Sequence, residues 1–126
     1  MKLLALAMLG GAIGSGARFL LNSWIARLLG TSFPWGIFLI NVTGSILMGL
    51  LAGLLAARAF EVVSLRTFLA TGILGGYTTF SAFSLDFANL VNEGQPGAAA
   101  LYVAGSVGLS LAGVFVGLWL ARVIAA

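Results

Sequence analysis

Long apolar stretches separated by a few charged residues dominate this 126-residue chain. Only six Lys or Arg and three Asp or Glu residues interrupt it, and four long uncharged segments remain between them. A membrane-spanning helix needs about 20 mostly apolar residues, and each segment with its flanks supplies them. We therefore predict an all-α membrane protein, a single domain over residues 1–126, with four transmembrane helices near residues 3–26, 34–57, 67–91 and 98–123.

Short polar segments separate the predicted spans. A hydroxyl cap and a proline stand at residues 31–34, just before span two. Arg58–Arg66 is the most charged part of the chain and is predicted to be a water-facing connection, and Asn92–Gly97 is rich in turn residues. The N-terminal residues also fit a cleaved signal peptide, but apolar residues resume after Arg18, so we expect a retained first span.

The basic residues are divided unevenly between the two ends of the predicted bundle. An even number of spans places both termini and the connection between spans two and three on one side of the membrane. That side carries four basic residues, namely Lys2, Arg58, Arg66 and Arg122. The other side carries Arg27, and also Arg18 if its side chain reaches in that direction. The positive-inside rule then favours cytoplasmic termini.

The composition narrows the possible functions. Charged residues make up 7% of the chain, against about a quarter in soluble domains, and the mean hydropathy is +1.16. The absence of His and Cys excludes disulfides, thiolate nucleophiles and metal ligation by those residues. The three acids, Glu61, Asp86 and Glu93, are far apart in sequence and offer little for acid–base catalysis. We do not expect an enzyme.

Many of the 18 glycines have a packing explanation. Small residues at four-residue spacing let helix backbones approach closely in lipid. Three pairs have this spacing, namely Gly10/Gly14, Gly49/Gly53 and Gly113/Gly117. No phosphate-binding glycine motif occurs in the sequence.

The third span has a different pattern and predicts a broken helix. Adjacent Gly75 and Gly76 are followed closely by Thr78 and Thr79, and glycines and β-branched residues both weaken helices. Backbone groups freed by a break are tolerated at membrane depth only when protein buries them or when they line an aqueous or ionic site. Four helices are few for that purpose, so the pattern favours an oligomer closing around span three. The alternative is a simple glycine kink.

Polar and aromatic side chains inside the spans suggest a lining for an ion. Phe80 and Phe83 share one helix face, which usually means packing, but ring edges are positive and can favour an anion. Asn41 is either a link between helices or a hydrogen-bond donor in a pore. A polar stripe on span four consists of Tyr102, Ser106 and Ser110.

Two charged residues inside or near the spans are further candidates. Arg18 is either functional or reaches to the interface with its long side chain. Asp86, near the far end of span three, is the one acid that could serve proton-coupled transport.

Three segments together resemble the Fluc (CrcB) fluoride channels. They are Gly10-Gly-Ala-Ile-Gly14 with Arg18, Asn41 in Asn-Val-Thr-Gly-Ser, and Gly75-Gly-Tyr-Thr-Thr-Phe-Ser-Ala-Phe83. The similarity runs over the whole chain in the same order, and the Gly-Gly-x-Thr-Thr-Phe-Ser-x-Phe run is highly specific. Ala82 departs from the pattern, because Thr or Ser often stands at this position in the family.

The resemblance implies a function and a set of roles. It implies a channel that passively exports cytosolic fluoride across the bacterial inner membrane, as an antiparallel, dual-topology homodimer with two pores. The partners are the fluoride ion, the lipid bilayer and a second copy of the chain, with no nucleic acid. The implied pore residues are Phe80, Phe83, Asn41, Tyr102, Ser106 and Ser110. Arg18 lies at a vestibule, and the backbone carbonyls of Gly75 and Thr78 hold a structural Na⁺ at the dimer interface.

Two other classes of protein share some of these features. A small multidrug-type, dual-topology exporter is also a four-span dimer, but such proteins carry an acid in the first span, and none occurs before Glu61 here. A structural membrane subunit that transports nothing explains the glycines, but it does not explain a polar stripe beside a broken helix.

Overall fold

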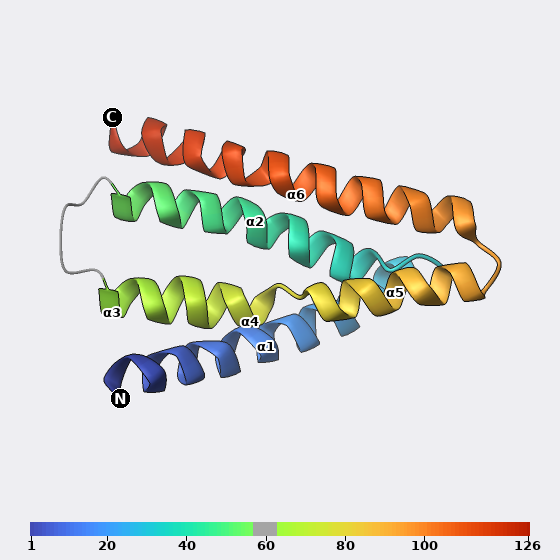
Figure 1. Cartoon of the computed structure of the whole chain (residues 1–126), viewed down its shortest axis with the longest axis horizontal. Coiled ribbons are helices and arrows are strands. Elements are labelled where there is room, and N and C mark those ends of the chain that lie inside the picture. The colour runs from blue at the N-terminus through green and yellow to red at the C-terminus, as the bar shows by residue number, and fades with distance from the viewer. Residues whose placement is uncertain (57–62) are drawn as a thin grey trace.

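Four long helical segments form an elongated bundle (Figure 1). The computed structural model describes residues 1–56 and 63–126. The elements are α1 (Lys2–Leu29), α2 (Trp35–Ala56), α3 (Val63–Arg66), the π-helical η1 (Thr67–Leu74), α4 (Gly75–Tyr77), α5 (Phe80–Asn92) and α6 (Pro96–Ala125). Among the described residues, four segments are long and apolar enough to cross a membrane, and the elements from α3 to α5 together make the third of them. The protein is thus an all-α, multi-pass membrane protein, as predicted.

The predicted turns lie where the helices end. Gly30 terminates α1 with a left-handed φ of +80°, and its N–H bonds the carbonyl of Ala26 at 2.9 Å. Gly94, with φ +73°, lies between α5 and α6, and Pro96 begins α6. The helices are a few residues longer at some ends than predicted. Residue 57, the predicted end of span two, lies outside the described residues.

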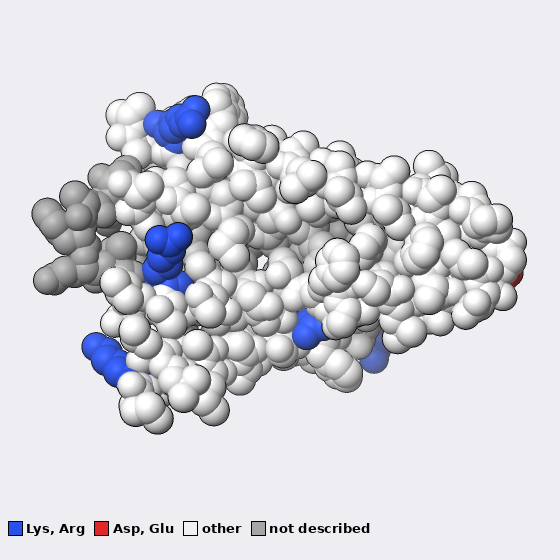
Figure 2. All heavy atoms as spheres, in the orientation of Figure 1, with Lys and Arg blue, Asp and Glu red and all other residues white. Residues whose placement is uncertain are grey.

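Both termini and the ends of α2 and α3 lie at the same end of the bundle (Figure 1). Lys2, Arg66 and Arg122 belong to helix ends at this side, whereas Arg27 is in the last turn of α1 at the other. In Figure 2 the basic side chains on the visible face stand mostly toward the end with both termini, and most of the surface is uncharged. Most of the predicted Arg58–Arg66 connection lies outside the described residues.

Close backbone contacts join the helices in two pairs. Helix α2 packs chiefly against α6, and α1 packs against η1 and α4. A side chain at Gly49 would collide with the backbone of Val114 on α6, and one at Gly14 would collide with the backbone of Ile73 and Tyr77. These contacts confirm that the spaced glycines serve helix packing.

A small buried core stabilises one half of the bundle. Tyr102 and Ile40 are fully buried, and Phe83 and Leu90 from α5 pack in the same cluster. Most other large apolar side chains are exposed on the chain, as expected of thin helices that face lipid or another subunit.

The third span is broken at two threonines. Thr78 and Thr79 are extended, with ψ values of 156° and 126°, between α4 and α5. Gly75 and Gly76 remain helical, so the break is not a glycine kink. The Thr79 hydroxyl caps α5 by accepting the N–H of Ala82 at 3.2 Å. The sequence therefore predicted the break correctly, and the threonines rather than the glycines form it.

Candidate functional site

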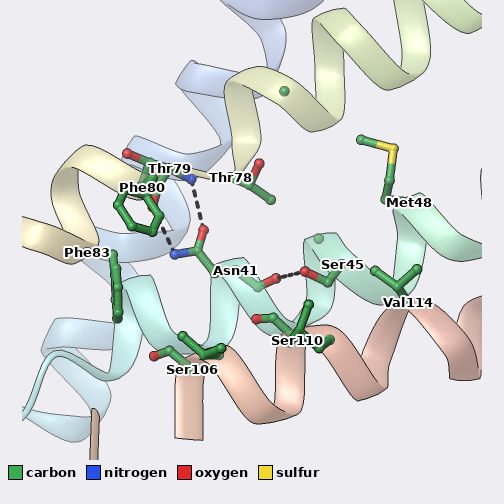
Figure 3. A pocket seen from close by; sticks show the side chains of 14 residues that line it. Asn41, Ser45, Met48, Thr78, Thr79, Phe80, Phe83, Ser106, Ser110 and Val114 are labelled. Carbon is green, nitrogen blue, oxygen red and sulfur yellow. Dashed lines mark hydrogen bonds between the residues drawn. The ribbon is translucent and has the colours of Figure 1, made fainter. Parts of the chain in front are cut away.

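A hollow of about 550 Å³ lies beside the break in the third span (Figure 3). It is open on one side of the chain, and α2, the break, α5 and α6 all contribute to its wall. The predicted site residues that line it are Asn41, Gly75, Thr78, Phe80, Phe83, Ser106 and Ser110. Residues far apart in sequence are thereby brought to one surface. Tyr102 and Arg18 are the two predicted site residues that do not line this hollow.

Asn41 holds the broken segment against α2. Its side-chain Nδ2 donates to the carbonyl of Thr79 at 3.0 Å, and its Oδ1 accepts the N–H of Thr79 at 2.8 Å. The amide therefore pairs with both backbone groups of one extended residue, and these groups would otherwise be unpaired at membrane depth. The Nδ2 group carries two hydrogens, so one donor remains beyond this pairing. Asn41 thus links two helices, and it also lines the hollow.

The serines on the wall differ in how their hydroxyls are used. Ser45 donates to the carbonyl of Asn41 on its own helix at 2.8 Å. Ser106 is only 4% exposed, and its hydroxyl has no hydrogen-bond partner among the described residues. A buried hydroxyl without a partner is unfavourable, so Ser106, which lines the hollow, has hydrogen-bonding capacity that the described residues do not use.

The two phenylalanines contact each other at the end of the hollow where α5 begins. Their ring centroids are 5.4 Å apart with an interplanar angle of 55°. Phe83 is 8% exposed, but Phe80 is 76% exposed in the single chain. Figure 3 shows both rings on the α5 side of Asn41, with Met48 and Val114 at the opposite end.

Tyr102 lies behind this wall. Its hydroxyl donates to Asp86 Oδ2 at 3.0 Å, and its ring packs on Phe83 with a centroid distance of 5.1 Å. On its other side the ring of Phe33 meets it edge-on at 5.5 Å. Sequence reasoning missed Phe33, because no pattern connects the segment before α2 with span four.

Arg18 does not extend to the end of its helix. Its Nε donates to the carbonyl of Gly76 at 3.1 Å, and the Ser15 hydroxyl lies 3.5 Å from the same oxygen. Arg18 also lines a second hollow of about 230 Å³ together with Ser15, Phe19 and Asn22. Arg18 therefore contacts the broken third span through its Nε.

The break leaves two backbone carbonyls on the wall without their usual donors. The Thr79 N–H, which would bond Gly75 in a continuous helix, donates to Asn41 instead. The Ala82 N–H, which would bond Thr78, donates to the Thr79 hydroxyl. Carbonyl oxygens are hard ligands, so these two can bind a hard cation. Within the described residues, no three His, Cys, Asp or Glu residues form a metal site.

Thr79 has a larger structural role than the sequence alone indicated. Its N–H and its carbonyl both bond the side chain of Asn41, and its hydroxyl accepts the N–H of Ala82. Threonine is a preferred N-cap residue, because its hydroxyl can accept the N–H of the third residue of the helix. Its pairing with Asn41, 38 positions away, could not be inferred from that pattern.

Comparisons with known proteins identify the family to which the chain is similar. The profile of the family described as "CrcB-like protein, Camphor Resistance (CrcB)" matches residues 5–118. A protein of Rhodopseudomonas palustris named "Fluoride-specific ion channel FluC" is 55% identical over 119 residues, which cover 94% of this chain and 96% of that protein. "Fluoride-specific ion channel FluC 2" of Nitrobacter hamburgensis is 54% identical over 117 residues, covering 93% and 94%. The chain therefore belongs to the CrcB-like family.

Proposed function

We propose that this protein is a fluoride-selective ion channel rather than an enzyme. Relatives about half identical to it, over nearly their whole length, are named fluoride-specific ion channels. The observation that carries the proposal is the set of polar residues and rings around the hollow. Ser106, whose hydroxyl has no partner among the described residues, lines it together with Ser110, across from the Phe80 and Phe83 rings. These groups offer an anion neutral donors and positive ring edges.

A neutral lining suits fluoride. The ion is small and strongly hydrated, so it needs hydrogen-bond donors in place of water. Binding must also be weak enough to release the ion, and a ring of fixed positive charges would hold it too tightly. Asn41, with its remaining Nδ2 hydrogen, and the serines meet both conditions. Tyr102 joins this set through its ring, which packs on Phe83.

The proposed assembly is an antiparallel, dual-topology homodimer with two pores. The hollow is open on one side, and Phe80 remains 76% exposed beside it. A pore that excludes lipid needs a second wall, and a second copy of the chain supplies it with matching helices. The excess of Lys and Arg at the end with both termini favours one orientation over the other, and a topology assay measures the two fractions.

A Na⁺ at the dimer interface is also part of the proposal. The Gly75 and Thr78 carbonyls fit this ion, because both have lost their helical donors and line the open hollow. The ion would supply positive charge that balances these oxygens at membrane depth. Arg18 is proposed to lie at an aqueous vestibule, where its charge attracts anions.

The proposed location is the bacterial inner membrane, and the proposed role is passive fluoride export. Neutral HF enters cells and dissociates there. The inside-negative potential then drives F⁻ outward by about 2.3 kcal/mol per 100 mV. The drug-exporter and structural-subunit alternatives are not favoured by the named relatives.

The test is fluoride efflux from liposomes that contain the purified protein, measured with a fluoride electrode. We expect rapid efflux once a potassium ionophore allows charge balance, and little chloride movement in a matched experiment. Efflux no faster than from protein-free liposomes, with protein verified as folded, would reject the proposal. Drug-driven proton movement in the same vesicles would instead revive the exporter alternative.

A further inference from the structure

Arg18 has a contact that an anion-attracting charge does not require. Its Nε, rather than the terminal guanidinium nitrogens, donates to the carbonyl of Gly76 at 3.1 Å. Gly76 is the residue next to Gly75 and two positions before the extended Thr78. The contact therefore lies at the edge of the break, inside the bundle, and Arg18 is only partly exposed there.

The carbonyl of Gly76 needs this donor because of the break. In a continuous helix the N–H of Phe80 would bond it, but Thr78 and Thr79 are extended, and Phe80 is the first residue of the next helix. A carbonyl at a helix C-terminus also carries partial negative charge, which a cation stabilises. The Ser15 hydroxyl is a weaker second partner at 3.5 Å.

The position of the Gly76 carbonyl affects how α1 and α4 pack against each other. At Gly76 a side chain would collide with the backbone of Gly11, so α1 and α4 are in direct backbone contact. Arg18 from α1 and Asn41 from α2 thus bind the two sides of the same break, at Gly76 and at Thr79. Nothing else among the described residues bonds the Gly76 carbonyl apart from Ser15.

We infer that Arg18 is a positioning residue that fixes the broken third span through a hydrogen bond from Nε to Gly76, and that this donor matters to the break independently of the positive charge. It acts on the carbonyls of the hollow only through the backbone of α4. Its consequence for ion passage rests on the proposed function, whereas its effect on the break does not.

Three substitutions separate the donor from the charge. Arg18→Gln removes the charge but keeps an N–H donor at the same bond distance from the backbone as Nε. Arg18→Lys keeps the charge but moves the donor one bond further out. Arg18→Met removes both while retaining most of the length. Arg27→Met is the matched control, because Arg27 is an exposed arginine in the last turn of the same helix.

The measurement is hydrogen–deuterium exchange over residues 72–84 in the full-length, detergent-solubilised protein. We expect Arg18→Met to raise exchange at Thr78 and Thr79 about tenfold, as loss of a charge-assisted hydrogen bond shifts local opening by that order. Arg18→Gln should stay within about threefold of the wild type, and Arg18→Lys should lie nearer to Arg18→Met. Arg27→Met should exchange as the wild type does.

If Thr78 and Thr79 stay protected from exchange in Arg18→Lys but not in Arg18→Gln, the inference is overturned, because the positive charge and not the donor would then stabilise the break. Wild-type exchange in all three Arg18 variants also overturns it. If Arg18→Met yields no folded protein, the comparison of Arg18→Gln with Arg18→Lys still decides. Fluoride efflux is measured on the same samples. If the wild-type protein shows no fluoride efflux but the exchange rates of the variants differ as expected, the proposed function is rejected and this inference stands.

Discussion

The hydroxyl of Tyr102, on α6, donates its only hydrogen bond to the carboxylate of Asp86, on α5, with an oxygen–oxygen distance of 3.0 Å. Tyr102 therefore differs from the serines of its polar stripe. While Asp86 is ionised, the Tyr102 hydroxyl presents only lone pairs to other groups. The Tyr102 ring, packed between Phe33 and Phe83, is then its main contribution to the wall.

Asp86→Asn should increase fluoride efflux. The variant keeps an oxygen that accepts the Tyr102 proton and removes a negative charge one helical turn from Phe83. Repulsion between like charges in a partly buried setting is on the order of 1 kcal/mol, or roughly a fivefold change in rate. The measurement is initial efflux from liposomes at equal protein density. Efflux that falls in Asp86→Asn would show that the carboxylate itself is required.

Asn41→Ala should severely destabilise the protein and abolish efflux. The substitution leaves the N–H and the carbonyl of Thr79 without partners, and for two part-buried groups this costs about 2–6 kcal/mol at most. The measurement is the unfolding midpoint in detergent together with efflux. Ser45→Ala is the matched control. It lies one turn away on the same wall, but its hydroxyl bonds only within α2, so stability should change little.

Leucine substitutions at the two phenylalanines should differ in their effect on stability but have the same effect on fluoride efflux. Phe83→Leu should destabilise the chain by about 1–2 kcal/mol, because a buried ring loses its contact with Tyr102. Phe80→Leu should leave the stability of the chain nearly unchanged, because that ring is 76% exposed. Both should slow efflux, since leucine offers no positive ring edge. Phe115→Leu, an exposed ring on α6 outside the hollow, should change neither quantity. Unaltered efflux in both pore variants would remove the role of the rings.

Alanine substitutions at two glycines should distinguish packing within the chain from packing between subunits. Gly49→Ala should cost about 1–3 kcal/mol, because its methyl group meets the backbone of Val114. Nothing in the described chain lies within 4 Å of a methyl group at Gly108, so Gly108→Ala should stabilise the helix by about 0.5–1 kcal/mol. Unfolding midpoints measure both. A Gly108→Ala variant that folds but sediments as a monomer would place Gly108 at the subunit interface.

Replacing Na⁺ with N-methylglucamine at constant ionic strength should weaken the dimer and slow efflux. The carbonyls of Gly75 and Thr78 then lack the cation proposed to balance them. Chemical cross-linking and efflux, measured on one preparation, report the two effects. K⁺ serves as the comparison ion, because its larger radius fits a Na⁺ site poorly. Equal dimer fractions and equal efflux in all three cations would contradict the proposed ion site.

Sequence and structure agree on the features that depend on local composition. Four spans follow from apolar length, and the turns at Gly30 and Gly94 follow from the backbone freedom of glycine. The weak helix in span three was also evident from its residues. Its exact form was not, because both glycines stay helical, with Gly76 packed against Gly11 of α1, while Thr78 and Thr79 extend.

The sequence by itself determined that this chain crosses a membrane four times, that span three is interrupted, and that neutral polar groups lie within the spans. These are properties of neighbouring residues, and they follow from hydropathy and helix propensity. Only the tertiary structure decided which partner each polar group binds. Asn41 bonds Thr79, Arg18 bonds Gly76, and Tyr102 bonds Asp86, while the buried Ser106 hydroxyl has no partner among the described residues. Such pairings depend on how distant helices are rotated and packed, and helical periodicity within one span carries no information about its neighbours.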